Sequence, residues 1–253
     1  MGAMINGYTA EQVRAAEAPL LAAGVPLMAR AAAGLAREIR TLLPEVGGSV
    51  LVLAGSGDNG GDAMYAGAEL AAGGSEVAII ATGSRVHEPA LAAALAAGSR
   101  RENVNDAARL AAKADVIVDG ILGTGTSTNP ALRGGALDVV EAILPVVAAP
   151  WHPVVVAVDI PSGINPNDGS VPASSTSGNV AVLPADVTVT FGGYKAGLLI
   201  PPAEVLAGRV VLIDIGLGPE LEKLQPVIRK ADGEPRPTSM RAGQTGTNEL
   251  PPN

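Results

Sequence analysis

Three short stretches of this chain carry residues that could bind a nucleotide or transfer a proton. Residues 55–62 are rich in glycine, residues 119–129 combine an aspartate with glycines and threonines, and residues 159–163 place Asp159 three positions before Ser162. Backbone N–H groups in a glycine-rich turn bind phosphate when a helix follows. A carboxylate at a strand end in a cleft is well placed for general acid–base chemistry. The three stretches predict one composite site if the fold brings them together.

The glycine-rich stretch partly resembles a dinucleotide-binding loop. Gly55, Gly57 and Gly60 match the G-x-G-x-x-G pattern. That fingerprint also expects an acidic residue about 20 positions later, at the end of the second strand. Here residues 81–84 read Ala-Thr-Gly-Ser and contain no acid. The sequence therefore disfavours an ordinary nicotinamide-dependent oxidoreductase, and a tight structural turn is the alternative to phosphate binding.

The second and third stretches each begin with an aspartate after an apolar run. The residues that follow Asp119 supply N–H and hydroxyl donors that suit a diphosphate, and Arg133 could pair with phosphate. Asp159 is a candidate for proton transfer. The structural alternatives are that Asp119 caps a helix or turn and that Asp159 forms an Asx-turn with Ser162. Lys195 follows a later predicted strand, and phosphate contact, catalysis and solvation are all open for it.

Asn59, Asp119 and Ser162, one from each stretch, offer only hard oxygen ligands. Such ligands suit an alkali cation better than a transition metal. The chain has no cysteine, and His87 and His152 lack the spacing of a metal-binding pair. We therefore expect both histidines to be surface or packing residues.

Composition and charge exclude several classes of protein. Aromatic residues make up 2% of the 253 residues and the formal net charge is −8, which is unfavourable for nucleic-acid binding. No apolar run reaches the roughly 20 residues that span a bilayer. No G-x-S-x-G or Walker A pattern occurs, so serine-hydrolase and P-loop chemistry lack support. The start of the chain does not resemble a signal peptide, and we expect a cytoplasmic protein.

Apolar runs that alternate with helical periodicity must position these stretches. The pattern predicts a helical region at residues 9–41, interrupted at Gly24 and Pro26, and four later helices at 63–72, 89–97, 107–112 and 134–149. Strands are predicted at 50–54, 76–81, 116–119, 154–158, 185–191 and 210–215. Strands that alternate with helices are typical of a parallel sheet buried on both faces. We expect a three-layer α/β fold: a Rossmann-like, doubly wound, mostly parallel sheet with helices on both faces. Ligands bind such sheets at the carboxyl ends of the strands, where the three stretches lie.

The expected domain covers residues 5–224. Residues 225–253 form a polar segment with several prolines and no apolar periodicity, and we expect this tail to be disordered. The first four residues are set aside because they could be a remnant of expression.

Residues 54–62, 118–125 and 158–163 together carry a family resemblance. They read Ala-Gly-Ser-Gly-Asp-Asn-Gly-Gly-Asp, Val-Asp-Gly-Ile-Leu-Gly-Thr-Gly and Val-Asp-Ile-Pro-Ser-Gly. In this order they closely resemble the NAD(P)H-hydrate epimerase family, the YjeF N-terminal domain. The resemblance continues through residues 191–198 and covers about residues 8–220.

The resemblance implies a Rossmann-like homodimer that epimerises hydrated NADH and NADPH at C6 of the nicotinamide ring. Interconverting the R and S forms lets a partner dehydratase, which accepts only the S epimer, repair the whole pool. By motif position, the residues that bind the hydrate would be Asp58, Asn59, Gly60, Gly61, Asp62, Gly123, Thr124, Gly125, Thr126, Ser127, Thr128, Asn129 and Asp159. A potassium ion would be held by Asn59, Asp119 and Ser162. We hypothesise that Asp159 is the catalytic acid/base.

One residue departs from the family pattern at the first loop. Asp58 stands where the family usually has asparagine, which adds a negative charge beside the expected phosphate-binding loop. The main alternative to the epimerase is a catalytically silent nucleotide-binding or scaffold protein on the same fold. Retention of Asn59, Asp119, Asp159 and Ser162 favours the enzyme, because a scaffold does not need that set.

Overall fold

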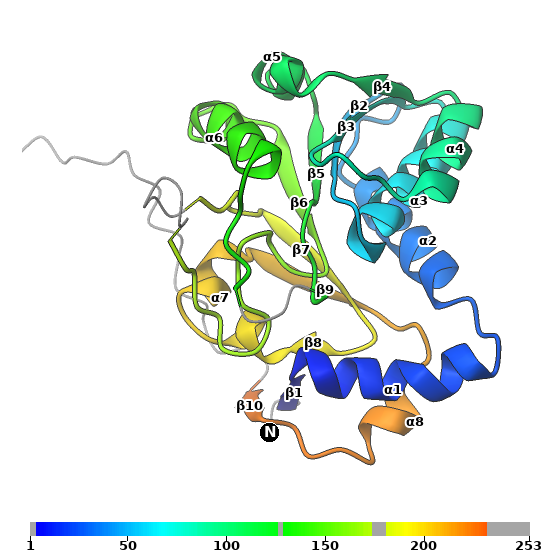
Figure 1. The fold of residues 1–253 in the computed structure, drawn as a ribbon, viewed down its shortest axis with the longest axis vertical. Coiled ribbons are helices and arrows are strands. Elements are labelled where there is room, and N and C mark those ends of the chain that lie inside the picture. Colours follow the sequence, from blue (N-terminus) through cyan, green and yellow to red (C-terminus); the bar gives the residue numbers. More distant parts are fainter. Residues whose placement is uncertain (1–3, 126–128, 174–180, 232–253) are drawn as a thin grey trace, which may run out of the picture.

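A seven-stranded, fully parallel sheet forms the centre of the molecule (Figure 1). The computed structural model describes residues 4–125, 129–173 and 181–231. Across the sheet the strand order is β4-β3-β2-β5-β6-β7-β9, and every neighbouring pair is parallel. The strands are β2 (Ser49–Ala54), β3 (Glu76–Ala81), β4 (Arg100–Glu102), β5 (Val116–Gly120), β6 (Val154–Val158), β7 (Val187–Phe191) and β9 (Arg209–Ile213).

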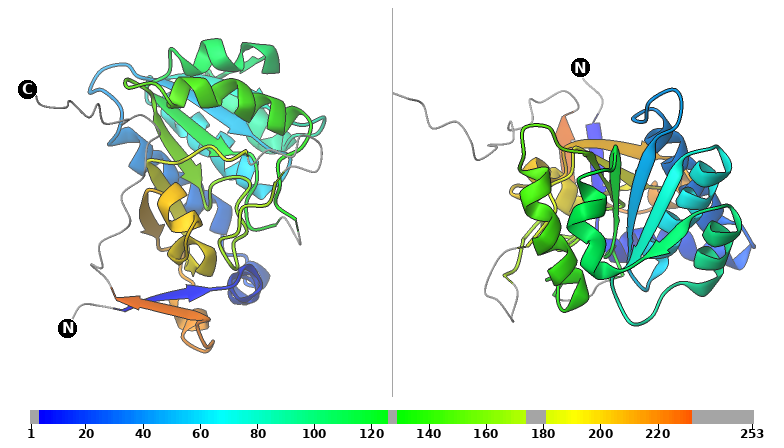
Figure 2. Two further views of the ribbon diagram at one scale, coloured as in Figure 1. Left: turned by 90° about the vertical axis from the view of Figure 1, so that its left-hand side faces the viewer. Right: turned by 90° about the horizontal axis from the view of Figure 1, so that it is seen from above.

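Helices cover both faces of the sheet, as the right-hand view of Figure 2 shows. One layer contains α2 (Leu27–Arg40), α3 (Asp58–Ala72) and α4 (Glu88–Ala96), and the other contains α5 (Ala107–Ala111) and α6 (Gly135–Val147). Side chains alternate between the faces of a strand. In β2, Val50 and Val52 therefore pack with the first layer, while Leu51 and Leu53 pack with the second. Burial on both faces explains the continuous apolar runs, and the predicted three-layer fold is confirmed.

The strand order reverses between β2 and β5, where the chain first winds outward in one direction and then in the other. The carboxyl ends of the two strands lie side by side, with Ala54 opposite Gly120. A hydrogen bond from Gly55 N to Gly120 O, 3.0 Å long, continues this pairing into the loops. Such a switch point leaves a crevice between loops that run to opposite faces, and ligands bind there in open α/β sheets.

A second, three-stranded sheet joins both ends of the described chain, in the order β10-β1-β8. Its strands are β1 (Met4–Tyr8), β8 (Tyr194–Lys195) and β10 (Ile228–Ala231), and α1 (Ala10–Ala22) follows β1 directly. Thr9 and Gln12 form the predicted capping box at the start of α1. In Figure 1, α1 runs beneath the main sheet beside α8 (Gly218–Leu221). The remaining short elements are η1 (Val104–Asp106), η2 (Ala196–Leu199) and α7 (Ala203–Leu206).

Two expectations from the sequence need correction. Helix α3 begins at Asp58 and not near residue 63, so the second half of the glycine-rich stretch is the first turn of a helix. Close packing explains these helical glycines, because a Cβ on Gly60 would lie 2.2 Å from the oxygen of Gly55. The segment predicted as a disordered tail begins inside ordered structure, since β10 pairs with β1 from Ile228 to Ala231. Residues 232–253 of that predicted tail lie outside the described residues.

In the described part of the chain, no single helix is long and apolar enough to cross a membrane. Helices α1 and α2 are long and apolar enough for a membrane span only when they are counted together, and the chain bends by 116° between them.

Candidate active site

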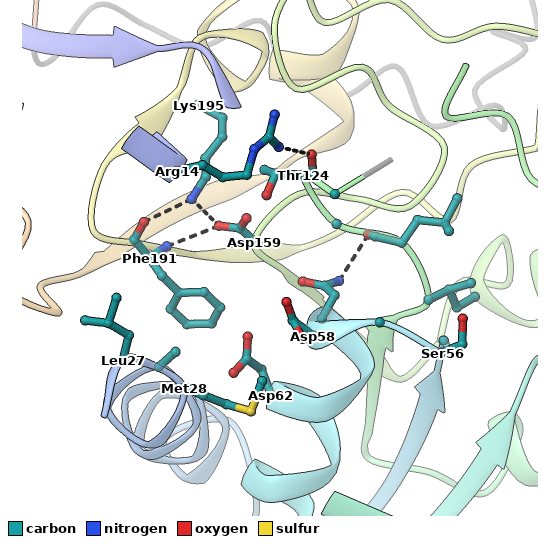
Figure 3. Close-up of a pocket in the computed structure, with 18 of the residues that line it drawn as sticks. Arg14, Leu27, Met28, Ser56, Asp58, Asp62, Thr124, Asp159, Phe191 and Lys195 are labelled. Carbon is teal, nitrogen blue, oxygen red and sulfur yellow. Dashed lines mark hydrogen bonds and ion pairs between the residues drawn. The ribbon is translucent and has the colours of Figure 1, made fainter. Parts of the chain in front are cut away.

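A pocket of about 620 Å³ opens at the switch point between β2 and β5 (Figure 3). Its walls come from the loop after β2, the first turn of α3, the loop after β5, and residues of α1 and α2. The end of β6 and the segment after β7 complete it. This volume lies within the range typical of small-molecule sites. The expectation that the three stretches share one site therefore fits the geometry.

The pocket gathers about half of the residues predicted to bind substrate. Those that line it are Asp58, Asn59, Asp62, Gly123, Thr124, Gly125 and Asp159, together with Arg133. Gly60 and Gly61 lie buried in the first turn of α3 behind this wall. Asn129 does not line the pocket, and its side-chain oxygen accepts a hydrogen bond from Ala131 N at 3.0 Å. Thr126, Ser127 and Thr128 lie outside the described residues.

The N-terminus of α3 forms the part of the pocket best suited to an anion. Gly57 caps the helix in an extended conformation and offers no side chain to the N–H groups of the first turn. Those donors and the positive end of the helix dipole attract phosphate. The next loop approaches closely, since a Cβ on Gly55 would lie 1.8 Å from the oxygen of Ile121. Only glycine allows this backbone contact, which keeps the first two loops together.

Asp159 has an unusual backbone conformation at the end of β6. Its φ of 67° makes it the one non-glycine residue with a left-handed backbone among the described residues. Such conformations cost roughly 1–3 kcal/mol and concentrate at functional sites. Asp159 Oδ1 accepts hydrogen bonds from Thr190 Oγ1 at 3.0 Å and from Phe191 N at 3.3 Å. It also forms an ion pair with Lys195. Because these contacts all involve Oδ1, Oδ2 is the oxygen available to a ligand.

Lys195 is buried beneath Asp159, with only 1% of its surface exposed. Its ammonium group also donates to Phe191 O at 2.9 Å and to Thr190 Oγ1 at 3.2 Å. Of the roles that the sequence left open for this lysine, simple solvation is excluded. A buried ammonium that binds Oδ1 of Asp159 holds this carboxylate in place at the pocket.

Asp119 is fully buried, and neither it nor Ser162 lines the pocket itself. Its carboxylate accepts hydrogen bonds from Ser162 Oγ at 2.6 Å, Ser162 N at 2.8 Å and Ile121 N at 3.3 Å. Burial raises the pKa of Asp119, and the hydrogen bonds from Ser162 and Ile121 partly oppose that rise. In the described ranges no cationic side chain pairs with it. A buried carboxylate without a protein counter-ion is a suitable place for a cation.

The other two predicted cation ligands converge on the backbone beside Asp119. Ser162 Oγ accepts a hydrogen bond from Leu122 N at 2.8 Å, and Asn59 Nδ2 donates to Leu122 O at 3.0 Å. The donor set is made of carboxylate, amide and hydroxyl oxygens, which fits an alkali ion. Over the residues that the structure describes, no cluster of three His, Cys, Asp or Glu side chains could hold a metal. His87 instead caps α4 by accepting from Ala90 N at 3.2 Å, in keeping with its expected packing role.

Asp62 points into the pocket from α3 and differs from the other two buried aspartates. It is 9% exposed, and its Oδ1 is buried with no hydrogen-bond partner. Burial raises the pKa of Asp62 well above 3.8, and the charges of Asp159, Asp58 and Glu17 raise it further. The ammonium of Lys195 has a smaller, opposite effect. The environment of Asp62 therefore favours the protonated carboxyl group.

Several lining residues were not predicted from the sequence, because they come from the N-terminal helices. Arg14 and Glu17 reach the pocket from α1, and Met28 reaches it from α2. Arg14 Nη1 donates to Thr124 O at 2.9 Å, so α1 contacts the loop after β5 directly. The sequence identified both helices but offered no motif to place them against the carboxyl ends of the strands. Lys195 was named from the sequence without a definite role. Its position in an apolar segment, directly before residues 196–200, was the sequence feature that indicated burial.

Comparisons with known proteins show similarity over most of the chain. Residues 24–197 match the family model described as YjeF-related protein N-terminus. A protein of Clavibacter michiganensis subsp. michiganensis named NAD(P)H-hydrate epimerase is 53% identical over 231 residues, which cover 89% of this chain and 96% of that protein. A Mycobacterium tuberculosis protein named bifunctional NAD(P)H-hydrate repair enzyme Nnr is 42% identical over 85% of this chain but 42% of its own length.

A solved structure also resembles the fold. The crystal structure of the yeast protein ynu0 superposes with a TM-score of 0.63 over 82% of this chain and 87% of that chain, at 19% identity. The family match includes the loops after β2, β5 and β6 and extends to Lys195. The chain therefore belongs to the family of YjeF-related protein N-terminal domains.

Proposed function

We propose that this chain is an NAD(P)H-hydrate epimerase, which interconverts the R and S forms of hydrated NADH and NADPH at C6 of the nicotinamide ring. Its biological role would be the repair of damaged cofactor. The observation that carries the proposal is the Asp159 carboxylate, held by Lys195 and facing a pocket that also contains a helix N-terminus. The names of relatives that match nearly the full chain support the same activity.

The reaction needs little from the protein beyond binding and proton transfer. The C6 hydroxyl lies next to the ring nitrogen, so its departure as water leaves a cation that the nitrogen stabilises. Addition of water to the other face then gives the opposite epimer, with no net redox change. Asp159 serves as acid/base in this proposal, because it lines the pocket and because Lys195 and Thr190 contact its Oδ1 and leave Oδ2 for the substrate. The N–H groups at the start of α3 would bind the diphosphate.

A potassium ion is part of the proposal. Asn59, Asp119 and Ser162 would hold it, and its charge would balance the buried Asp119 carboxylate and fix the loop that begins at Ile121. Support comes from the oxygen-only donor set and from the convergence of these side chains on Leu122. Ion binding at this position would organise the pocket floor without taking part in proton transfer.

The oligomeric state, the cellular location and the partner enzyme of this chain are proposed from its resemblance to the family. We propose a cytoplasmic homodimer whose product passes to an NAD(P)H-hydrate dehydratase. Relatives named bifunctional repair enzymes support this coupling, because the present chain matches only 42% of their length. In such proteins a second activity would be joined to the epimerase in one chain.

A coupled assay tests the activity. The R epimer of hydrated NADH is mixed with a dehydratase specific for the S epimer, with and without this protein and potassium. We expect faster recovery of NADH when the protein is present, and Asp159→Asn should remove most of that effect. No acceleration at high protein concentration would refute the epimerase and favour a silent nucleotide-binding or scaffold protein. Near-normal epimerisation by Asp159→Asn would refute the role of this residue.

A further inference from the structure

Inversion at C6 poses a geometric problem for a single acid/base. The departing hydroxyl leaves from one face of the nicotinamide ring, whereas the entering water must attack the opposite face. A carboxyl group fixed on one wall of the pocket reaches only one of these faces. Asp159 is fixed in this way, since Lys195, Thr190 and the Phe191 N–H group all hold its Oδ1.

A second carboxyl group enters the same pocket from another element. Figure 3 shows Asp62 extending upwards from α3, while Asp159 lies above it in the same view, and both residues line the pocket. The Phe191 ring lies beside the space between them. A flat ring bound in that space would meet one carboxyl group on each side.

The surroundings of the two carboxyl groups suit complementary roles. Asp159 is surrounded by donors, since Lys195, Thr190 and the Phe191 N–H group all contact its Oδ1. Asp62 Oδ1 has no donor within the described residues, and burial and neighbouring carboxylates raise its pKa. Two titratable groups with opposite surroundings in one pocket are the usual arrangement of an acid and a base.

We propose that Asp62 is a second catalytic acid/base of this site and acts on the ring face opposite Asp159, an inference that rests on the proposed epimerase function. In one direction the Asp62 carboxyl proton passes to the C6 hydroxyl, and the C6–O bond breaks to release water. The nitrogen lone pair forms a C=N bond with C6. Water on the other face forms a new C6–O bond and gives its proton to Asp159. Solvent then returns both carboxyl groups to their starting states, and the reverse reaction exchanges their roles.

The other charged groups that line the pocket are less suitable for this role. They are Arg14, Glu17, Asp58, Arg133 and Lys195. Asp58 and Arg133 are exposed, and Lys195 is occupied by Asp159. Burial also raises the pKa of Glu17, but this residue lies on α1 and is only partly buried. Asp62 alone among them is both nine-tenths buried and left with an unpartnered oxygen.

The test uses Asp62→Asn in water enriched in ¹⁸O, with each epimer as substrate. Asparagine keeps the shape of the side chain but cannot transfer a proton, and we expect inversion to fall by about 100-fold or more. Oxygen exchange without inversion should continue for the epimer whose hydroxyl faces Asp159, because that carboxyl group can still release water and take it back on its own face. A purely structural role would lower exchange and inversion together for both epimers.

Wild-type protein provides a second measurement that does not depend on how the variant folds. Departure and entry on opposite faces require each inverted product molecule to carry one solvent oxygen at C6. Inverted product that keeps its original oxygen would overturn the proposal. Wild-type inversion rates in Asp62→Asn would overturn it, and so would equal loss of exchange and inversion for both epimers.

Asp138→Asn is the matched control, because Asp138 is an exposed aspartate in the first turn of α6 and does not line the pocket. Its inversion and exchange rates should equal those of the wild type. The result also separates the two proposals. If the wild type does not epimerise at all, the proposed function fails and this inference fails with it; if the wild type and Asp138→Asn epimerise and Asp62→Asn does so equally well, only the role of Asp62 is wrong.

Discussion

Replacing Lys195 with methionine should destabilise the protein strongly, because it leaves a buried carboxylate without its counter-ion. Lys195 is 1% exposed and Asp159 is 7% exposed, so water cannot take over the lost contact. The substitution also removes hydrogen bonds to Phe191 O and Thr190 Oγ1. Breaking one partner of a buried ion pair typically costs about 3–5 kcal/mol. For a chain of this size, that predicts a fall in Tm of roughly 6–20 °C.

Urea denaturation of wild type, Lys195→Met, Asp159→Asn and the double variant measures this cost and separates its origins. The double variant replaces both charges with neutral groups of similar size, so we expect it to recover to within about 2 kcal/mol of wild type. A loss below about 1 kcal/mol in Lys195→Met, or a double variant less stable than both single variants, would refute the reasoning.

Three further predictions concern the pocket and its floor. Asp62→Asn should be more stable than wild type at pH 7. Because the pKa of Asp62 is raised in the folded wild type, the folded chain binds more protons than the unfolded chain above pH 3.8. The stability of the wild type therefore falls as pH rises from 3.8 through the raised pKa, whereas asparagine does not titrate. Equal unfolding free energies at pH 7 would contradict this. Gly123→Ala places a Cβ 2.8 Å from Asn59 Oδ1, and we expect roughly tenfold weaker activation by potassium in a titration of initial rates. An unchanged titration midpoint would count against Asn59 as a ligand. If the proposed potassium site is correct, potassium should raise the Tm of wild type in thermal denaturation, because an ion that binds only the folded chain stabilises it. Asp119→Asn should lose this rise, and an equal rise in both proteins would exclude Asp119 as a ligand.

Much of the fold could be predicted because most strands of the main sheet are local apolar runs that can be recognised in the sequence. Val154–Val158 is a continuous apolar run, and Glu76–Ala81 is apolar after its first residue; the structure places strands at the same residues. Parallel strands that alternate with helices bring their carboxyl ends to one edge. The loops that begin near Gly55, Asp119 and Asp159 therefore had to approach one another, and the pocket gathers residues from all three regions.

The features that could not be predicted depend on contacts between segments far apart in the sequence. No local pattern indicates that Arg14 lies over the loop after β5, or that Lys195 pairs with Asp159, 36 residues earlier. The sequence also cannot show that Asp62 Oδ1 lacks a hydrogen-bond partner, because this depends on which side chains surround it in the fold. Strand β10 was missed because Ile228–Ala231 has mixed polarity and is ordered by pairing with β1.

The pairing of β1 with both β8 and β10 has a consequence for the order in which the molecule is completed during synthesis. Helix α1, which supplies Arg14 to the pocket, is made before the strands of the main sheet. The strand that anchors it, β1, pairs with Ile228–Ala231, which are made after that sheet. Gln12 Nε2 also donates to Gln225 O at 2.7 Å. The main sheet can therefore form on a growing chain before the pocket has its full wall. A nascent chain that ends before residue 228 should have its core but bind substrate weakly, and ligand binding should appear only when β10 leaves the ribosome.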